Sequence, residues 1–152
     1  MLKPNLLRQI IVEQIPFFKQ DPDLLEVYIT EGGVQATGTQ SASYLNEYQI
    51  QVLAMDYTGE LSELSLAILM FARKHQPDLL FNPDKRANGI RYKADILDNE
   101  KIDVLFTIQA SERVIVKKEN GKITQTHITE PTPALPMPAW DIVIDEGVMT
   151  HE

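Results

Sequence analysis

The sequence predicts an α+β protein in which an antiparallel β-sheet of about four to five strands has two α-helices packed on one face. Two segments repeat apolar residues at helical spacing, and several shorter segments alternate apolar and polar residues as strands do. Short turns join the alternating segments, which favours hairpins. Four prolines fall at positions 131, 133, 136 and 138, so a Pro-rich C-terminal arm is expected after the sheet.

The first predicted helix runs from Pro4 to about Lys19 and is amphipathic. Pro4 suits the first turn of a helix, because the N–H that it lacks would have no partner there. Pro16 removes a backbone donor inside the pattern. We therefore expect a kink or an early end at Pro16.

Two strands are predicted next. Leu24–Thr30 has strand composition, and the Glu-Gly-Gly at 31–33 indicates a bulge or a turn. From Tyr48 the alternation is regular, with the even-numbered residues to Ala54 on one face. The opposite face is only half polar, which indicates that something covers it.

The second predicted helix follows the turn Asp56–Gly59 and ends at Pro77, and Ser62 can cap its start. It is apolar on nearly all sides, whereas a helix lying on one sheet has a single apolar stripe. We therefore expect burial on two sides. The N-terminal helix, a neighbouring subunit, or both can cover the second side. The candidate interface residues of this helix are Leu66, Leu69 and Met70.

The best hairpin of the sequence joins Ile90–Leu97 to Ile102–Val116 through a four-residue turn. The segment before it, residues 81–89, is predicted to be a polar loop. A turn at 118–122 leads into another short alternating segment that ends near Thr129.

The chain is predicted to divide into one α+β domain, residues 1–129, and an arm, residues 130–152. The arm contains no Lys or Arg, and its prolines exclude it from the middle of a sheet. It carries one short strand-like piece, Trp140–Ile144. We expect Trp140, Ile142 and Ile144 to contact a neighbouring subunit, for example by adding a strand to its sheet edge.

Composition excludes several classes of function. The formal net charge is −8, and the longest basic run is Lys117–Lys118, so binding of nucleic acid through a basic patch is disfavoured. The absence of cysteine excludes disulfides and thiolate zinc sites, and it fits a reducing cytoplasm. The longest apolar block, Leu66–Ala72, is too short to span a bilayer, and no signal peptide is recognisable. We expect no membrane association.

Catalytic signals are weak. The three histidines stand at a helix end, on a strand and near the chain end, and no hydrolase, zinc or nucleotide motif occurs. No catalytic residue, cofactor or metal is expected. The most enzyme-like group is acidic and flanks the hairpin turn: Asp95, Asp98, Glu100 and Asp103. Converging carboxylates can hold Mg²⁺, but a solvated turn explains all four.

Glu112 is the least expected charge in the sequence. It shares the parity of Ile108 and Val114, which places a carboxylate on the apolar face of its strand. Two interpretations are open. Either the strand has already left the core at this point, which we favour, or Glu112 makes a specific polar contact.

A set of short stretches spans essentially the whole chain: Met-Leu-Lys-Pro at the start, Asp-Tyr-Thr-Gly-Glu at 56–60, Gln-Pro-Asp at 76–78, the aspartate-containing hairpin at 92–104, Ser-Glu-Arg at 111–113 and His-Ile-Thr-Glu-Pro at 127–131. Together and in this order they resemble the tail completion protein R family of contractile-tailed temperate bacteriophages. Each stretch alone is a turn or a helix stop. The motif residues carried over are Asp56, Tyr57, Thr58, Gly59, Gln76, Pro77, Asp78, Asp95, Glu112, Glu130 and Pro131.

The resemblance implies a non-enzymatic assembly protein of a phage or prophage, made in the bacterial cytoplasm. Such a protein acts at the head-proximal end of the virion tail and is needed for head–tail joining. It further implies a tail-terminator-like subunit that forms a ring, commonly of six, in contact with tail tube and head-connector proteins. Family members often have Trp in the second helix, where this chain has Phe71, so the packing of that helix differs.

Two other functions compete with assembly. One is a small acidic protein-interaction module, which requires negative charge concentrated on one face. The other is a metal-dependent hydrolase that uses Asp95, Asp98 and Asp103.

Overall fold

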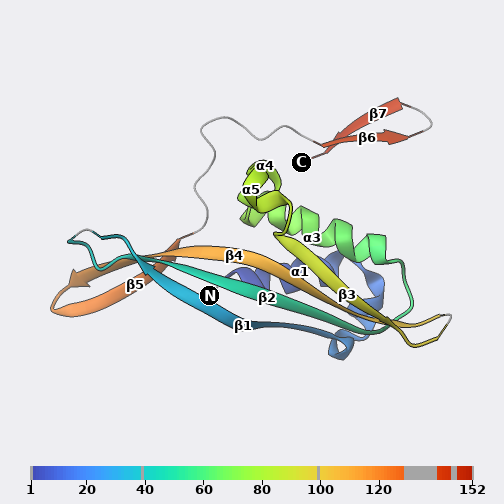
Figure 1. Ribbon diagram of the computed structural model, residues 1–152, viewed down its shortest axis with the longest axis horizontal. Coiled ribbons are helices and arrows are strands. Elements are labelled where there is room, and N and C mark those ends of the chain that lie inside the picture. Colours follow the sequence, from blue (N-terminus) through green and yellow to red (C-terminus); the bar gives the residue numbers. More distant parts are fainter. Residues whose placement is uncertain (1, 39, 99, 129–139, 145–146, 152) are drawn as a thin grey trace.

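The computed structural model describes residues 2–38, 40–98, 100–128, 140–144 and 147–151. It is an α+β fold with one five-stranded antiparallel sheet (Figure 1). The longer helices are α1 (Lys3–Gln14) and α3 (Leu61–His75), and α2 (Pro16–Gln20) follows α1 closely. This confirms the fold class predicted from the sequence.

The strands of the sheet are β1 (Leu25–Ala36), β2 (Tyr44–Tyr57), β3 (Ile90–Ile96), β4 (Ile102–Glu119) and β5 (Lys122–Ile128). Their order is β1-β2-β4-β3, and β5 also pairs with β4. One edge of β4 pairs with β2 from residue 102 to residue 114. On its other edge, β3 pairs with residues 102–108 and β5 with residues 113–119, so residues 109–112 lie between them.

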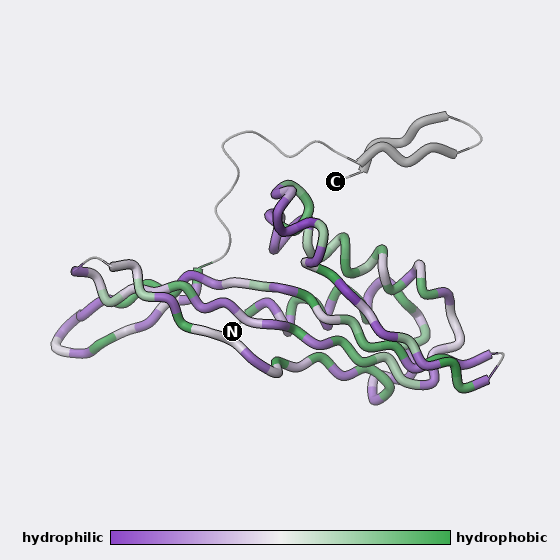
Figure 2. Tube along the Cα trace, in the orientation of Figure 1, coloured by the Kyte–Doolittle hydropathy of each residue, from purple (hydrophilic) through white to green (hydrophobic). Residues whose placement is uncertain are grey.

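The core follows from the alternation of the strands. The even-numbered residues of β2 from 48 to 54 are at most 3% exposed, and Val104, Phe106 and Ile108 continue the same face on β4. The buried residues of α1 and α3 join these strand residues in one cluster. Because the strand residues share one face, the helices cover that face only, as predicted (Figure 2).

Helix α3 is buried on two sides, as its composition predicts. Its core residues are Leu64, Ala67, Ile68, Phe71 and Ala72. They pack into the same cluster as the sheet, and α3 also contacts α1. The N-terminal helix therefore covers the second side. Leu66 remains 51% exposed on the outer side of α3.

The predicted interruption at Pro16 is confirmed. α1 ends at Gln14, Ile15 adopts an extended conformation (φ −119°, ψ 105°), and Pro16 begins α2. Proline is tolerated at the first position of a helix, so the chain starts a new helix instead of continuing the old one. The new direction brings Phe17 and Phe18 against Tyr57 at the end of β2, at ring-centroid distances of 5.3 Å each.

The predicted hairpins and the bulge are also confirmed. β3 and β4 pair in register, with Asp95 opposite Asp103. The β1–β2 pairing shifts between Ile29 and Gly32, where the sequence indicated a bulge or a turn. Asn120 and Gly121 have φ values of 52° and 79° in the turn from β4 to β5. Two successive positive φ values match the twist of a two-residue hairpin.

Two local expectations were wrong. Glu60, and not Ser62, is the residue that precedes α3, and its N–H donates to Glu63 Oε1 (3.2 Å). The segment 81–89, expected to be a polar loop, lies partly in the short helices α4 (Asp78–Phe81) and α5 (Pro83–Arg86). The Asn82 side chain starts α5 by accepting from the N–H of Asp84 (3.0 Å).

The predicted strand Trp140–Ile144 is present as β6, and it pairs with a strand that was not predicted, β7 (Gly147–His151). The two form an antiparallel sheet of their own. The proline positions of the predicted arm lie outside the described residues. Within the described part of the chain, no helix has the length and hydrophobicity to cross a membrane.

Candidate functional site

On the edge of β4 that pairs with β3 and β5, residues 109–112 lie between the two paired stretches. Side chains from α1 and α3 contact the backbone of β4 there. The N–H of Ser111 donates to Gln76 Oε1 (3.0 Å), and its carbonyl accepts from Lys3 Nζ (2.5 Å). Lys3 Nζ also donates to Gln76 Oε1 (2.5 Å). Because Lys3 starts α1 and Gln76 ends α3, both helices are fixed to one edge of the sheet. We call this group the polar junction, and its members are Lys3, Gln76, Ser111, Glu112 and His127.

Glu112 is the buried carboxylate of the polar junction, with 1% of its surface exposed. Its Oε1 accepts from the backbone N–H groups of Leu2 (2.9 Å) and Lys3 (3.0 Å), and its Oε2 lies 3.1 Å from His127 Nδ1. A strand residue thus caps the first turn of α1, where the helix dipole favours negative charge. The interpretation that β4 leaves the core at Glu112 is wrong. The alternative, a specific polar contact, is confirmed.

The surroundings of Glu112 stabilise its charged form. Burial alone would raise the pKa of this carboxyl. Hydrogen bonds from the Lys3 N–H, the Tyr48 hydroxyl, the Leu2 N–H and His127 outweigh burial, so the pKa of Glu112 lies below its usual value. The native contacts of Glu112 therefore favour the ionised carboxylate.

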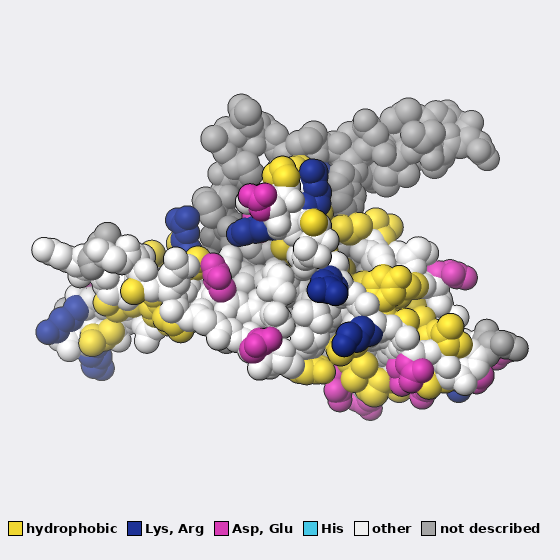
Figure 3. Space-filling model, in the orientation of Figure 1, with side chains coloured by type: hydrophobic (Ala, Val, Ile, Leu, Met, Phe, Trp, Pro, Cys, Tyr) yellow, Lys and Arg dark blue, Asp and Glu magenta, His cyan; other side chains and the backbone are white. Residues whose placement is uncertain are grey.

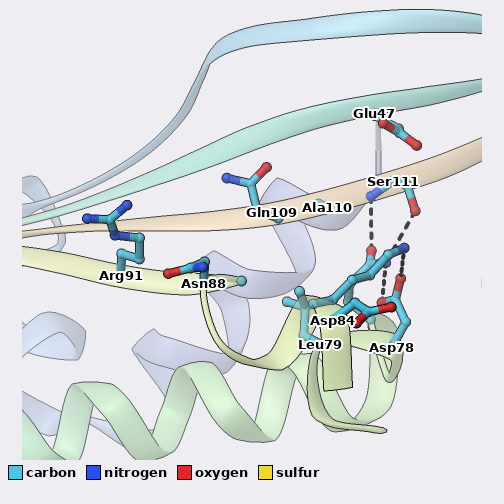
Figure 4. A pocket seen from close by; sticks show the side chains of 12 residues that line it. Glu47, Asp78, Leu79, Asp84, Asn88, Arg91, Gln109, Ala110 and Ser111 are labelled. Carbon is cyan, nitrogen blue, oxygen red and sulfur yellow. Dashed lines mark hydrogen bonds and ion pairs between the residues drawn. The ribbon is translucent and has the colours of Figure 1, made fainter. Parts of the chain in front are cut away.

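Asp78 extends the polar junction away from the sheet. Gln76 Nε2 donates to Asp78 Oδ1 (2.7 Å) and to Ser111 Oγ (3.2 Å), and Asp78 Oδ2 pairs with Lys85 Nζ at 2.7 Å. Burial raises the pKa of Asp78, but the hydrogen bonds from Lys85 and Gln76 together with the nearby positive charges outweigh this effect. The pKa of Asp78 therefore lies below its usual value. A pocket of about 420 Å³ lies beside these residues, against the edge of β4 (Figure 4). The Gln-Pro-Asp stretch thus ends α3 and ties its end to β4.

The hydrogen bonds of the polar junction connect α1, the end of α3 and β4. The Lys3 and Gln76 side chains hydrogen-bond with each other and with the backbone of Ser111 on β4, and the Glu112 side chain accepts from the backbone of α1. Within the described ranges, no group of three or more His, Asp and Glu side chains is placed to bind a metal ion. The arrangement can hold two helices and a sheet edge in a fixed geometry.

A second site lies at the opposite end of β2, in the turn 56–59. Asp56 has a positive φ of 51°, and its N–H donates to Asp103 Oδ1 (2.9 Å) on β4. Tyr57 is 1% exposed and stacks on Phe18. A Cβ added at Gly59 would lie 2.6 Å from Tyr57 Cζ, so the turn requires glycine at this position.

A groove of about 720 Å³ opens beside this turn and runs to the β3–β4 turn. Its apolar lining includes Leu61, Ile96 and Ile102, and Ile96 is 75% exposed. Its charged lining comes from both turns and consists of three carboxylates, those of Glu60, Asp98 and Glu100, and one cation, Lys101. We call this feature the acidic groove. Burial, together with Glu63 and Glu60, raises the pKa of Tyr57 in its wall to about 12.

Gly59→Ala is expected to lower the free energy of unfolding by about 2 kcal/mol, because the added methyl group overlaps the Tyr57 ring. Urea denaturation followed by circular dichroism measures the change. Gly33→Ala is the matched control, since a Cβ at Gly33 meets no atom within 4 Å. Equal stability of the two variants would contradict the contact between Gly59 and Tyr57.

Comparison with known proteins identifies the family of this chain. The family described as "P2 phage tail completion protein R (GpR)" matches residues 1–131 of the 152 in the chain. The chain belongs to the tail completion protein R family. One relative, "Tail completion protein R" of Escherichia phage P2, is 28% identical over 137 residues, which cover 90% of this chain and 88% of the relative. No solved structure matches.

The family match includes all residues of the polar junction and of the acidic groove. The structure brings Gln76 and Asp78 to within hydrogen-bond contact of each other at the end of α3, and Gln76 meets the strand that carries Glu112. The motif residues Asp56, Tyr57, Thr58 and Gly59 lie apart from them, at the other end of β2. Glu130 and Pro131 lie outside the described residues.

Asp98 and Asp103 accept hydrogen bonds from backbone N–H groups of two turns. Asp98 Oδ1 accepts from the N–H groups of Glu100 (2.7 Å) and Lys101 (2.9 Å) within the β3–β4 turn. Asp103 accepts from the N–H of Asp56, and Asp95 pairs with Asp103 across the two strands. Asp95, Asp98 and Asp103 thus all belong to the β3–β4 hairpin of this chain.

The predicted interface residues differ in accessibility. Leu66 is exposed, whereas Leu69 and Met70 are half-buried on α3. Trp140, Ile142 and Ile144 lie in β6, where their backbones pair with β7. Their contact with a neighbouring subunit stays a prediction.

The sequence interpretation missed Lys3, Ser111 and His127 as members of the polar junction. A signal for Lys3 was present, because it stands four positions before Leu7 and eight before Ile11 on the buried stripe of α1. Lys3 is 3% exposed. Ser111 acts mainly through its backbone, which no residue pattern reports.

Proposed function

We propose that this protein is a non-enzymatic tail completion subunit that acts at the head-proximal end of a contractile phage tail and is required for head–tail joining. The observation that carries the proposal is the family match over residues 1–131. The relative from Escherichia phage P2 supports it over 90% of the chain. The subunit would be made in the cytoplasm of the host bacterium and would end in the virion tail.

The geometry is consistent with an assembly role. The residues that carry the family motifs lie at the ends of helices and in the turns between strands, and the side chains of Gln76, Asp78 and Glu112 are engaged in hydrogen bonds there. Several large apolar side chains are exposed on the body of the protein, among them Leu66, Tyr92, Ile96 and Ile123. Exposed apolar side chains of this size favour contacts with other proteins.

We further propose that the subunits form a ring, with six copies as the expected number, between the tail tube and the head connector. Residues 1–129 would form the body of each subunit. Residues 130–152, nearly all beyond the family match, would form an arm that contacts a neighbouring subunit or the tail tube. The exposed Leu66 and the half-buried Leu69 and Met70 on α3 are proposed to take part in the contacts.

Deletion of the gene from its phage is expected to yield full heads that lie apart from tails in an electron micrograph of the lysate. Restoring the full-length gene should restore joined particles. A gene truncated after Thr129 tests the arm, and we expect it to restore few joined particles. Joined particles in the deletion lysate would contradict a role in head–tail joining.

A further inference from the structure

The two ends of β4 carry opposite charge. The turn from β4 to β5 presents three exposed lysines, Lys117, Lys118 and Lys122, against one exposed carboxylate, Glu119. The opposite end of β4 adjoins the β3–β4 turn and the acidic groove, with the carboxylates of Glu60, Asp98 and Glu100. Figure 3 shows Lys and Arg side chains at one end of the elongated molecule and Asp and Glu side chains gathered toward the other.

The acidic groove offers more than carboxylates. Its lining combines these charges with the exposed side chain of Ile96 and with Ile102. Tyr57 also lines the groove, at 1% exposure, and its buried hydroxyl has no hydrogen-bond partner among the described residues. That hydroxyl lies against Gly59, which is itself part of the groove lining.

The basic end has the complementary chemistry. Lys118 pairs directly with Ile123 across β4 and β5, so the two side chains share one face of the hairpin. Ile123 is 72% exposed, although it is apolar. A cation beside an apolar side chain matches a groove that has carboxylates beside exposed isoleucine. We call residues 117–123 the basic tip.

One copy cannot bring its own basic tip to its own acidic groove. Both features are attached to β4, which is 18 residues long. A strand rises about 3.3 Å per residue, so the two features are separated by roughly 55 Å along β4. Only the tip of a second copy can reach the groove.

We propose that the acidic groove of one copy binds the basic tip of a second copy, head to tail. This contact rests on the proposed function in one respect, because it supplies the subunit-to-subunit contact of the proposed ring. A head-to-tail contact uses two different surfaces, so a pair of copies keeps one free tip on the first copy and one free groove on the second, and repetition closes a ring when the rotation permits. Complementary charge determines the direction of the contact.

Cysteine cross-linking tests the contact directly, because the chain contains no cysteine. Glu100→Cys and Lys118→Cys are made as separate proteins, mixed and oxidised at neutral pH. We expect a disulfide-linked dimer from the mixture that exceeds the dimer from either variant alone. Glu47→Cys, exposed on β2 away from both features, replaces Glu100→Cys as the control. A yield no greater than that of the control would overturn the proposal.

Charge reversal gives an independent measurement that a folding defect cannot imitate. Lys118→Glu alone or Glu100→Lys alone should weaken self-association about tenfold by sedimentation, since each replaces attraction by repulsion. An equimolar mixture of the two variants should associate at least ten times more tightly than either alone, because each variant can pair with the other. Failure of the mixture to recover association would overturn the proposal. The electron micrographs of the deletion lysate are independent of this result, so the contact can fail while the role in head–tail joining holds.

Discussion

Glu112→Ala is expected to lower the free energy of unfolding by about 3 kcal/mol, because it leaves buried donors without an acceptor. The carboxylate accepts from the N–H groups of Leu2 and Lys3 and contacts His127. Its loss also removes two of the hydrogen bonds that hold the start of α1 on β4. Urea denaturation at pH 7 measures the change, and a loss below about 0.5 kcal/mol would contradict the role of Glu112 in the polar junction.

The same carboxylate predicts a loss of stability in acid. A group whose pKa is lowered by folding stabilises the protein above its unfolded pKa, and this stability disappears as the pH falls through the folded pKa. For Glu112 the loss begins near its reference value of 4.5 and continues below it. The pKa of His75 is lowered by burial and by Lys74 and Lys3, so protonation of this residue adds a separate loss that begins near 6.5.

Two control variants separate these effects. Glu119→Ala removes an exposed carboxylate from the same strand and should change the free energy of unfolding by no more than about 0.5 kcal/mol. Glu112→Gln keeps one carbonyl acceptor but cannot ionise. It should flatten the loss of stability below pH 4.5 and leave the loss near 6.5 unchanged. A pH profile identical to that of the unmodified protein would contradict the lowered pKa.

Phe71→Ala is expected to lower the free energy of unfolding by about 4 kcal/mol, because truncation of a buried aromatic side chain leaves a cavity. Phe71 is fully buried in the cluster that joins α3 to the sheet. Denaturation at low protein concentration measures the stability of the single subunit.

Leu66→Ala is the matched comparison on the same helix. Leu66 is 51% exposed, so its truncation should change the stability of the subunit by less than about 1 kcal/mol. If Leu66 takes part in a contact between subunits, the same variant should weaken self-association in sedimentation. Equal losses of subunit stability in the two variants would contradict the burial of α3 described above.

The helices and strands that were predicted correctly from the sequence are those whose pattern is contained in neighbouring residues. The alternation from Tyr48 to Ala54 identified both the strand and its buried face, since period two is a property of the strand itself. Pro16 identified the break between α1 and α2, because the missing N–H acts within one turn. The apolar residues on nearly all sides of α3 correctly indicated that two sides of this helix are buried.

The polar junction had no such signal. Its hydrogen bonds join residues separated by 35 positions, as for Gln76 and Ser111, or by 110, as for Leu2 and Glu112. Parity alone placed Glu112 on the apolar face, but parity cannot reveal a partner. The short helices after Gln76 were missed for another reason. Their polar residues resemble a loop, and side-chain contacts such as that of Asp78 with Lys85 accompany the helical turns.

The cap of α1 by Glu112 also bears on synthesis of the chain. The first helix leaves the ribosome early, but the carboxylate that completes its first turn is added 110 positions after Leu2. Contacts between residues so distant in sequence form late, because closing a long loop costs chain entropy before any contact is gained. We therefore expect α1 to remain loosely held while the polypeptide is translated. Docking of the nascent N-terminus would wait until β4 has emerged from the ribosome, so the subunit would become rigid only after that strand is synthesised.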